Sequence, residues 1–186
     1  MNVKQKALSF SLIAAVISGV CATAYAAQVP AGVELAAKQE LVRNNGSEPA
    51  SLDPHKVESD VEFNIIGDVF EGLVAVRKDG SIEPRLAESW DNKDNTVWTF
   101  HLRKGVTWSD GEPITAEDVV WSWRRLVDPK TVSPYASFPG NMNIENAADI
   151  ANGKKPVDTL GVKALDDNTI QVTLTQPTAA FLSMLA

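Results

Sequence analysis

Apolar and polar residues alternate most clearly between Trp98 and Arg103. Trp98, Phe100 and Leu102 are apolar, and the residues between them are polar. Because successive side chains of a strand point to opposite faces, this pattern predicts a β-strand with one buried face. A second alternation, carried by Ile170, Val172 and Leu174, predicts the buried face of a hairpin formed by residues 162–165 and 169–175.

Two helices are predicted from a shared start signal, a hydroxyl residue followed three positions later by an acid. Thr115 and Asp118 precede one apolar stripe at helical spacing, and Asp128-Pro129 ends it because proline has no N–H to donate. Ser59 and Glu62 precede a second stripe, with Gly72 near its end. The stripes are Val119, Val120, Trp123, Leu126 and Val127 in the first helix, and Ile65, Ile66, Val69, Phe70 and Leu73 in the second.

Weaker patterns fill the remaining chain. Residues 40–43 suggest a first strand, and 73–77 with 81–82 suggest a hairpin around Lys78-Asp79-Gly80. A helix is expected over residues 143–152, ending at Gly153, and another apolar helical pattern follows Pro177. Strands and helices therefore mix along the chain, which predicts an α+β (mixed α/β) fold.

The first 26 residues are predicted to be an export signal. Lys4 and Lys6 form a basic start, an apolar run follows, and Ala24-Tyr25-Ala26 has the small-x-small pattern of a cleavage site after Ala26. A membrane anchor is the alternative, but the apolar run is short for spanning a bilayer. Cys21 suggests a lipoprotein as a further alternative, although a lipidation site would have a small residue before the cysteine and Val20 occupies that position. Cleavage after Ala26 would place the protein in the periplasm and remove its only cysteine.

The charge balance excludes some partners. The 186 residues carry a net charge of −7, and loss of Lys4 and Lys6 with the signal would leave 15 basic and 24 acidic residues, hence −9. Nucleic acids and anionic membranes attract Lys/Arg patches, so neither is expected as a partner.

Candidate catalytic and metal-binding chemistry is sparse. His55 and His101 are the only histidines, and neither lies at the spacing of a zinc site, so no metal or cofactor is expected. Asp110, Glu117 and Asp118 could form an acid/base pair, but turn and helix-cap roles explain them better. The tryptophans at 98, 108, 121 and 123 could suggest a sugar or aromatic binder, but their spacing favours core positions, with Trp121 facing away from the helix stripe. No nucleophile motif is present, and we expect no enzyme.

Several blocks resemble one family in the same order. Residues 98–129, WTFHLRKGVTWSDGEPITAEDVVWSWRRLVDP, resemble the central signature of the periplasmic solute-binding proteins of peptide and nickel ABC transporters. Neighbouring blocks resemble the oligopeptide-binding branch, bacterial extracellular solute-binding protein family 5. These blocks are residues 29–56, FEGL at 70–73, AESWDNKD at 87–94, DPKTVSPYAS at 128–137 and LGVKALDDNTIQVTLTQP at 160–177.

The resemblance implies a periplasmic binding protein-like type II fold with two lobes around a ligand cleft. Members of this family are longer, so the chain is expected to be an N-terminal fragment. Residues 27–70 would be the first segment of lobe I, and 71–186 most of a smaller α+β domain that is incomplete.

The resemblance also implies which residues bind the ligand. In oligopeptide-binding proteins a short extended segment runs beside the peptide, and here it corresponds to residues 57–60, which include Glu58, Ser59 and Asp60. Main-chain pairing would hold a peptide whatever its side chains. Ser59 and Asp60 replace the glycine and apolar residue usual in the family. Tyr135 corresponds to a tyrosine that reaches the ligand backbone. The alternative without ligand binding is that residues 57–60 form a surface loop and that Tyr135 is a packed side chain.

Two functions follow from the resemblance. The first is a monomeric subunit that captures short peptides for an inner-membrane ABC permease, with murein-peptide, dipeptide or nickel carriage as close variants. The second is a truncated, non-binding remnant of such a protein. Residues that would hold the ligand termini are expected beyond Ala186.

Overall fold

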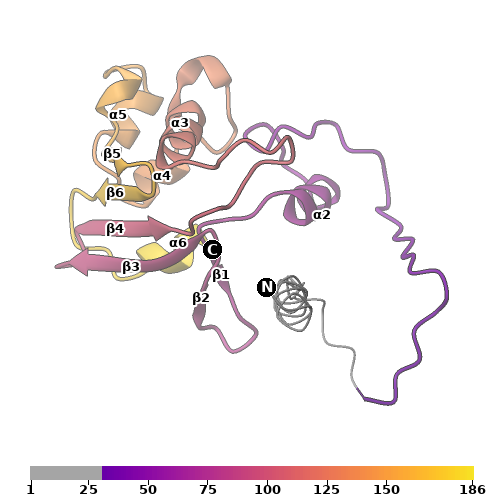
Figure 1. Ribbon diagram of the computed structural model, residues 1–186. Coiled ribbons are helices and arrows are strands. Elements are labelled where there is room, and N and C mark those ends of the chain that lie inside the picture. Colours follow the sequence, from indigo (N-terminus) through magenta and orange to yellow (C-terminus); the bar gives the residue numbers. More distant parts are fainter. Residues whose placement is uncertain (1–30) are drawn as a thin grey trace, which may run out of the picture. The chain divides into compact units, whose positions relative to one another are not determined.

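The computed structural model describes residues 31–186, and a four-stranded antiparallel sheet forms the core of residues 44–186 (Figure 1). The spatial order of the strands is β3-β4-β6-β5. Their bounds are Ala87–Lys93 for β3, Val97–Leu102 for β4, Val162–Asp166 for β5 and Thr169–Thr173 for β6. The mixed α/β fold predicted from the sequence is confirmed.

The predicted alternation places one apolar face of the sheet in the core. Trp98 of β4 pairs with Val172 of β6, and Val172 pairs with Val162 of β5, so these three side chains form one row across the sheet. All three are at most 3% exposed. Phe100 and Ile170 form the next row and are fully buried. Polar Thr99 and His101 occupy the opposite face of β4, as predicted.

Helix α3 (Ala116–Val127) covers the sheet at its β5 and β6 side. Thr115 is its N-cap, and the Asp118 carboxylate accepts a hydrogen bond from the Thr115 N–H at 2.7 Å. Ala116, Val120 and Val127 are completely buried. The helix ends before Asp128-Pro129, and the predicted cap, stripe and stop are all confirmed.

Shorter elements complete the structure. The predicted hairpin consists of β1 and β2, and α6 inserts Phe181 against Trp98 and Phe100, with ring centroids 5.5 and 6.4 Å apart. The bounds are Asp60–Val69 for α2, Val74–Val76 for β1, Ile82–Pro84 for β2, Phe138–Asn141 for α4, Ala147–Ala151 for α5 and Phe181–Leu185 for α6, with 3-10 turns at Pro129–Thr131 and Val157–Thr159.

The strand predicted at residues 40–43 is wrong. Leu41 and Val42 are 83% and 93% exposed, and the described residues 31–43 contain neither helix nor strand. A strand needs a partner for its backbone groups, and residues 31–186 supply none here.

Two predicted helices are shorter than expected. Helix α2 ends at Val69 because Phe70 has an extended backbone, and the Leu73 carbonyl accepts hydrogen bonds from Arg85 and Ala87 instead of continuing the helix. Helix α5 begins only at Ala147, since Asn143 and Asn146 have positive φ angles of 60° and 65° that no α-helix accommodates.

The described residues divide into two parts. Residues 44–186 form one compact unit, and the described residues 31–43 lie outside it. The predicted signal sequence, Cys21 and the cleavage after Ala26 lie outside the described residues. Within residues 31–186 none of the helices has the length and apolar character needed to cross a membrane.

Candidate functional site

The carboxylate of Glu62 organises the segment that leads into α2. Glu62 is only 4% exposed and is the one buried residue of this helix. Its Oε1 accepts the Ala50 N–H at 2.9 Å, and its Oε2 accepts the N–H groups of Glu58 at 3.0 Å and Ser59 at 3.1 Å. The hydrogen bond to Ser59 is the capping interaction predicted from the sequence, and the other two extend it to the preceding loop.

These hydrogen bonds also set the charge of the group. The backbone N–H groups of Glu58 and Ser59 favour the ionised carboxylate and lower the pKa of Glu62 from 4.5 to about 2, although burial acts in the opposite direction. Glu62 is therefore a carboxylate at neutral pH, and residues 58 and 59 are held in place by a charged acceptor.

The three predicted binding residues of this segment lie at the start of α2. Glu58 and Asp60 are exposed, and Ser59 is half-buried with an extended backbone. Asp60, expected in extended conformation, is instead the first residue of the helix, and its Oδ1 accepts the Val61 N–H at 2.9 Å. The extended part is thus limited to Val57, Glu58 and Ser59.

Tyr135 lies in the loop before α4, and an aromatic contact connects it to α2. The rings of Tyr135 and Phe63 meet edge to face with centroids 6.3 Å apart. Phe63 lies one helical turn after Ser59, since the Phe63 N–H donates a hydrogen bond to the Ser59 carbonyl at 3.1 Å. The structure therefore brings Tyr135 near the segment that carries Glu58, Ser59 and Asp60. Sequence reasoning missed Phe63, which the helical spacing from Ser59 could have indicated.

A second polar cluster joins the loop before this segment to α3. Arg125 makes a two-pronged ion pair with Asp53, and its Nη1 lies 2.6 Å from His55 Nδ1. Because a guanidinium only donates, Nδ1 accepts, and neutral His55 carries its proton on Nε2, which faces Ser122 Oγ at 3.3 Å.

The same contacts explain the titration behaviour of this cluster. The hydrogen bond from Arg125 holds the pKa of Asp53 well below its ordinary value, and burial together with the positive Arg125 lowers the pKa of His55. The cluster can anchor the loop at residues 51–56 to α3.

The remaining sequence candidates have structural roles. The Asp110 carboxylate accepts the Glu112 N–H in a turn, and Asp118 caps α3, as predicted. Glu117 contacts Arg124 at 3.3 Å. Trp98 is buried and Trp121 is 62% exposed, as expected, but Trp108 is 43% exposed, so a core position is wrong for Trp108. An isolated antiparallel bridge between Thr107 and Pro113 closes its loop.

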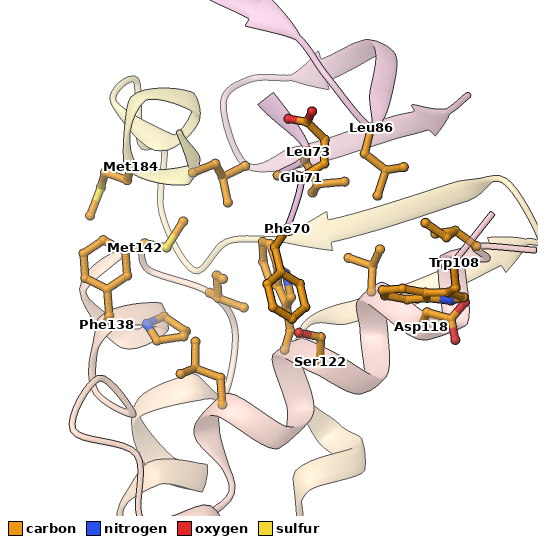
Figure 2. A pocket seen from close by; sticks show the side chains of 18 residues that line it. Phe70, Glu71, Leu73, Leu86, Trp108, Asp118, Ser122, Phe138, Met142 and Met184 are labelled. Atoms are coloured by element: carbon orange, nitrogen blue, oxygen red, sulfur yellow. The ribbon is translucent and has the colours of Figure 1, made fainter. Parts of the chain in front are cut away.

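An apolar cavity of about 360 Å³ lies between residues 70–73, which follow α2, and the helices α3, α4 and α6 (Figure 2). Phe70 and Trp108 point into it, and Met142 and Met184 line another side. Of its acidic side chains, Asp118 is already engaged in the cap of α3. None of the four predicted binding residues lines this cavity, and its few polar groups suit apolar packing better than recognition of a peptide main chain.

Metal ligands do not gather in the described part of the chain. Among residues 31–186, no group of three or more His, Cys, Asp or Glu side chains is arranged to hold an ion. His101 faces Asp91 at 3.0 Å on the polar side of the sheet.

Comparison with known proteins defines the class of protein to which this chain belongs. Residues 81–186 match the family model for the middle part of bacterial extracellular solute-binding proteins, family 5. The chain is 54% identical over 182 residues to the periplasmic oligopeptide-binding protein OppA of Escherichia coli, covering 98% of this chain and 33% of that protein. It is 49% identical to the Escherichia coli periplasmic murein peptide-binding protein MppA over 162 residues, or 87% of this chain and 30% of the relative.

Solved structures agree with this class. Haemophilus influenzae OppA in complex with the peptide RPPGFSPFR superposes with a TM-score of 0.78 and 49% identity, over 82% of this chain and 30% of the other. The Escherichia coli murein tripeptide-binding protein MppA superposes with a TM-score of 0.73 and 47% sequence identity. This match covers 75% of this chain and 27% of the other. Both neighbours are type II periplasmic binding proteins.

The chain therefore belongs to the bacterial extracellular solute-binding proteins of family 5, as the resemblance predicted. These are solute-binding proteins rather than enzymes. The chain spans about a third of the length of the curated relatives it matches.

Proposed function

We propose that this protein is the extracytoplasmic solute-binding subunit of an ABC importer and that it captures oligopeptides in the periplasm. The observation that carries this proposal is the 54% identity to an oligopeptide-binding relative along nearly the whole chain. The peptide in the Haemophilus influenzae complex supports the same ligand class. Export with cleavage after Ala26, monomeric action and delivery to an inner-membrane permease are parts of the proposal.

The start of α2 would contribute one edge of the ligand site. Its Glu58 and Ser59 N–H groups are already bound by Glu62. The Glu58 carbonyl accepts no hydrogen bond from any donor in residues 31–186. This segment would therefore accept hydrogen bonds from ligand N–H groups, which recognises a peptide main chain independently of its side chains. Tyr135 would contact the ligand from the opposite loop, and closure of two lobes would enclose it.

The test uses protein produced from its complete coding sequence. Peptides that copurify are released by denaturation and identified by mass spectrometry, and tri-alanine binding is measured by calorimetry. We expect short peptides of varied sequence and a measurable affinity for tri-alanine. Absence of affinity for every tripeptide and dipeptide tested would overturn the proposal.

Matched ligands and variants sharpen the result. Murein tripeptide, dipeptides and Ni²⁺ are titrated beside tri-alanine, and a preference for one of them would redefine the ligand class. Tyr135→Ala is expected to weaken tri-alanine binding, whereas Trp108→Ala removes a similarly exposed aromatic ring that lines the apolar cavity and leaves the affinity unchanged.

A further inference from the structure

We propose that Phe63 and Tyr135 together form a side-chain subsite that selects an aromatic residue in the bound peptide. This inference rests on the proposed function, since it needs a peptide beside the start of α2. It adds a residue, Phe63, that belongs to none of the predicted binding positions.

The helix geometry directs Phe63 toward the proposed peptide. Its N–H donates to the Ser59 carbonyl, so its Cα lies one turn beyond Ser59. Side chains of an α-helix lean toward the N-terminus and cover the preceding turn. The Phe63 ring therefore lies over the turn that begins with Ser59 and Asp60, at the end of the extended segment.

Tyr135 holds the other side of the subsite. The loop around it is fixed by two hydrogen bonds, from the Tyr135 N–H to Ser133 Oγ at 3.2 Å and from the Phe138 N–H to the Tyr135 carbonyl at 2.9 Å. The edge-to-face contact then orients the two rings relative to each other. A pair fixed in this way loses little conformational freedom when a third ring packs against it.

The pair is nevertheless accessible. Phe63 is 44% exposed and Tyr135 is 41% exposed, so each ring keeps a large free surface beside its partner. Aromatic rings favour edge-to-face or offset neighbours, which are worth more than their buried area alone. A ligand phenylalanine, tyrosine or tryptophan could continue the arrangement, whereas alanine at the same position would leave both rings in water.

Two carboxylates precede Phe63 at the start of α2, and they suggest a cationic ligand residue as the main alternative. Glu58 and Asp60 are exposed, and no ion pair engages either of them within the described chain. A lysine or arginine could be attracted by these charges and by the ring faces. The fixed edge-to-face pair favours an aromatic ligand residue, and the experiment separates the two ligand classes.

The test compares tri-alanine with three peptides that carry phenylalanine at position one, two or three, and with the three matching lysine peptides. Affinities are measured by calorimetry on protein from the complete coding sequence. We expect phenylalanine at one position to improve binding about threefold to tenfold over tri-alanine. Phe63→Ala should remove that gain while tri-alanine binds within about twofold of the wild type.

Phe70→Ala is the matched control. Phe70 follows the other end of α2, has a similar exposed fraction of 46% and points into the apolar cavity, so its loss should leave the phenylalanine preference intact. Phe63→Tyr should retain the preference, and a thermal unfolding curve verifies that each variant is folded.

The outcomes separate the two proposals. If tri-alanine binds but phenylalanine gives no gain at any position, or the gain persists in Phe63→Ala, the aromatic subsite is overturned and the peptide-binding function stands. A stronger gain from lysine that Asp60→Asn abolishes would also overturn it, in favour of a cation site. If no peptide binds, the proposed function fails and the subsite with it.

Discussion

Helices α2 and α3 begin with the same motif but are held by different forces. In each, a hydroxyl residue is the N-cap and an acid three positions later returns to the cap N–H. In α3 three fully buried apolar side chains follow, and Asp118 serves only the cap. In α2 the buried residue is the acid, Glu62, while Phe63 and Val69 are exposed.

The difference lies in what each acid contacts beyond the cap. Asp118 hydrogen-bonds to Thr115 alone, so α3 depends on burial against the sheet for its stability. Glu62 also binds the N–H groups of Ala50 and Glu58, so α2 and the preceding loop are organised by a single carboxylate. The same local sequence signal thus caps a packed helix in one place and shapes a candidate ligand-binding segment in the other.

The largest expected effect is on the free energy of unfolding, when a phenylalanine is replaced by alanine either in the sheet core or in α2. Phe100→Ala removes a fully buried ring that packs against Phe181 of α6, and we expect it to lower the free energy of unfolding by about 3–5 kcal/mol. Phe63→Ala in α2 removes a ring that is 44% exposed and should cost about 1 kcal/mol or less. Denaturant unfolding of both variants measures the contrast, and equal losses would show that α2 is packed as firmly as α3.

A second prediction concerns the acids themselves. In Glu62→Gln one oxygen becomes an NH₂ group that faces N–H donors, so the hydrogen bonds to Ala50 or to Glu58 and Ser59 are lost. We expect amide hydrogen exchange to accelerate roughly tenfold either at Ala50 or at Glu58 and Ser59, according to which oxygen is replaced. Asp118→Asn is the matched control, because it alters the cap of α3 and should leave those amides unchanged. Unaltered exchange in Glu62→Gln would contradict the role assigned to its carboxylate.

Strong periodicity made the sheet and α3 predictable. The alternation in β4 and β6 and the stripe in α3 correspond to the faces that are buried in the structure. Strand β3 was not predicted, because a bulge between Ala87 and Ser89 shifts the register, so that Ala87 pairs with Leu102 and Trp90, three residues later, pairs with Phe100. Its sequence therefore shows no regular alternation.

The candidate site was predictable only in part. The cap formed by Ser59 and Glu62 follows from local spacing, but the hydrogen bond from Ala50 joins residues 12 positions apart and leaves no periodic trace. The contacts of Arg125 with Asp53 and His55 span about 70 positions and depend on the tertiary fold. The ring contact of Phe63 with Tyr135 is of the same long-range kind.

The smallest expected effect is the acid dependence of the Glu62 interaction. Because folding lowers the pKa of Glu62 from 4.5 to about 2, its contribution to stability is fully present above pH 4.5 and is lost as the pH falls toward 2. Glutamine does not titrate, so the stability difference between the wild type and Glu62→Gln should be constant near neutrality and shrink between pH 4.5 and pH 2.

Denaturant midpoints measured for both proteins across this pH range test the prediction. The pKa of the Asp53 carboxyl is also lowered, by its ion pair with Arg125. This ion pair is present in both proteins, so its effect cancels in the stability difference. A difference that does not change with pH would mean that Glu62 acts through its shape and packing. A difference that fades on acidification would show that the charged carboxylate holds the start of α2, in contrast to the apolar packing that holds α3.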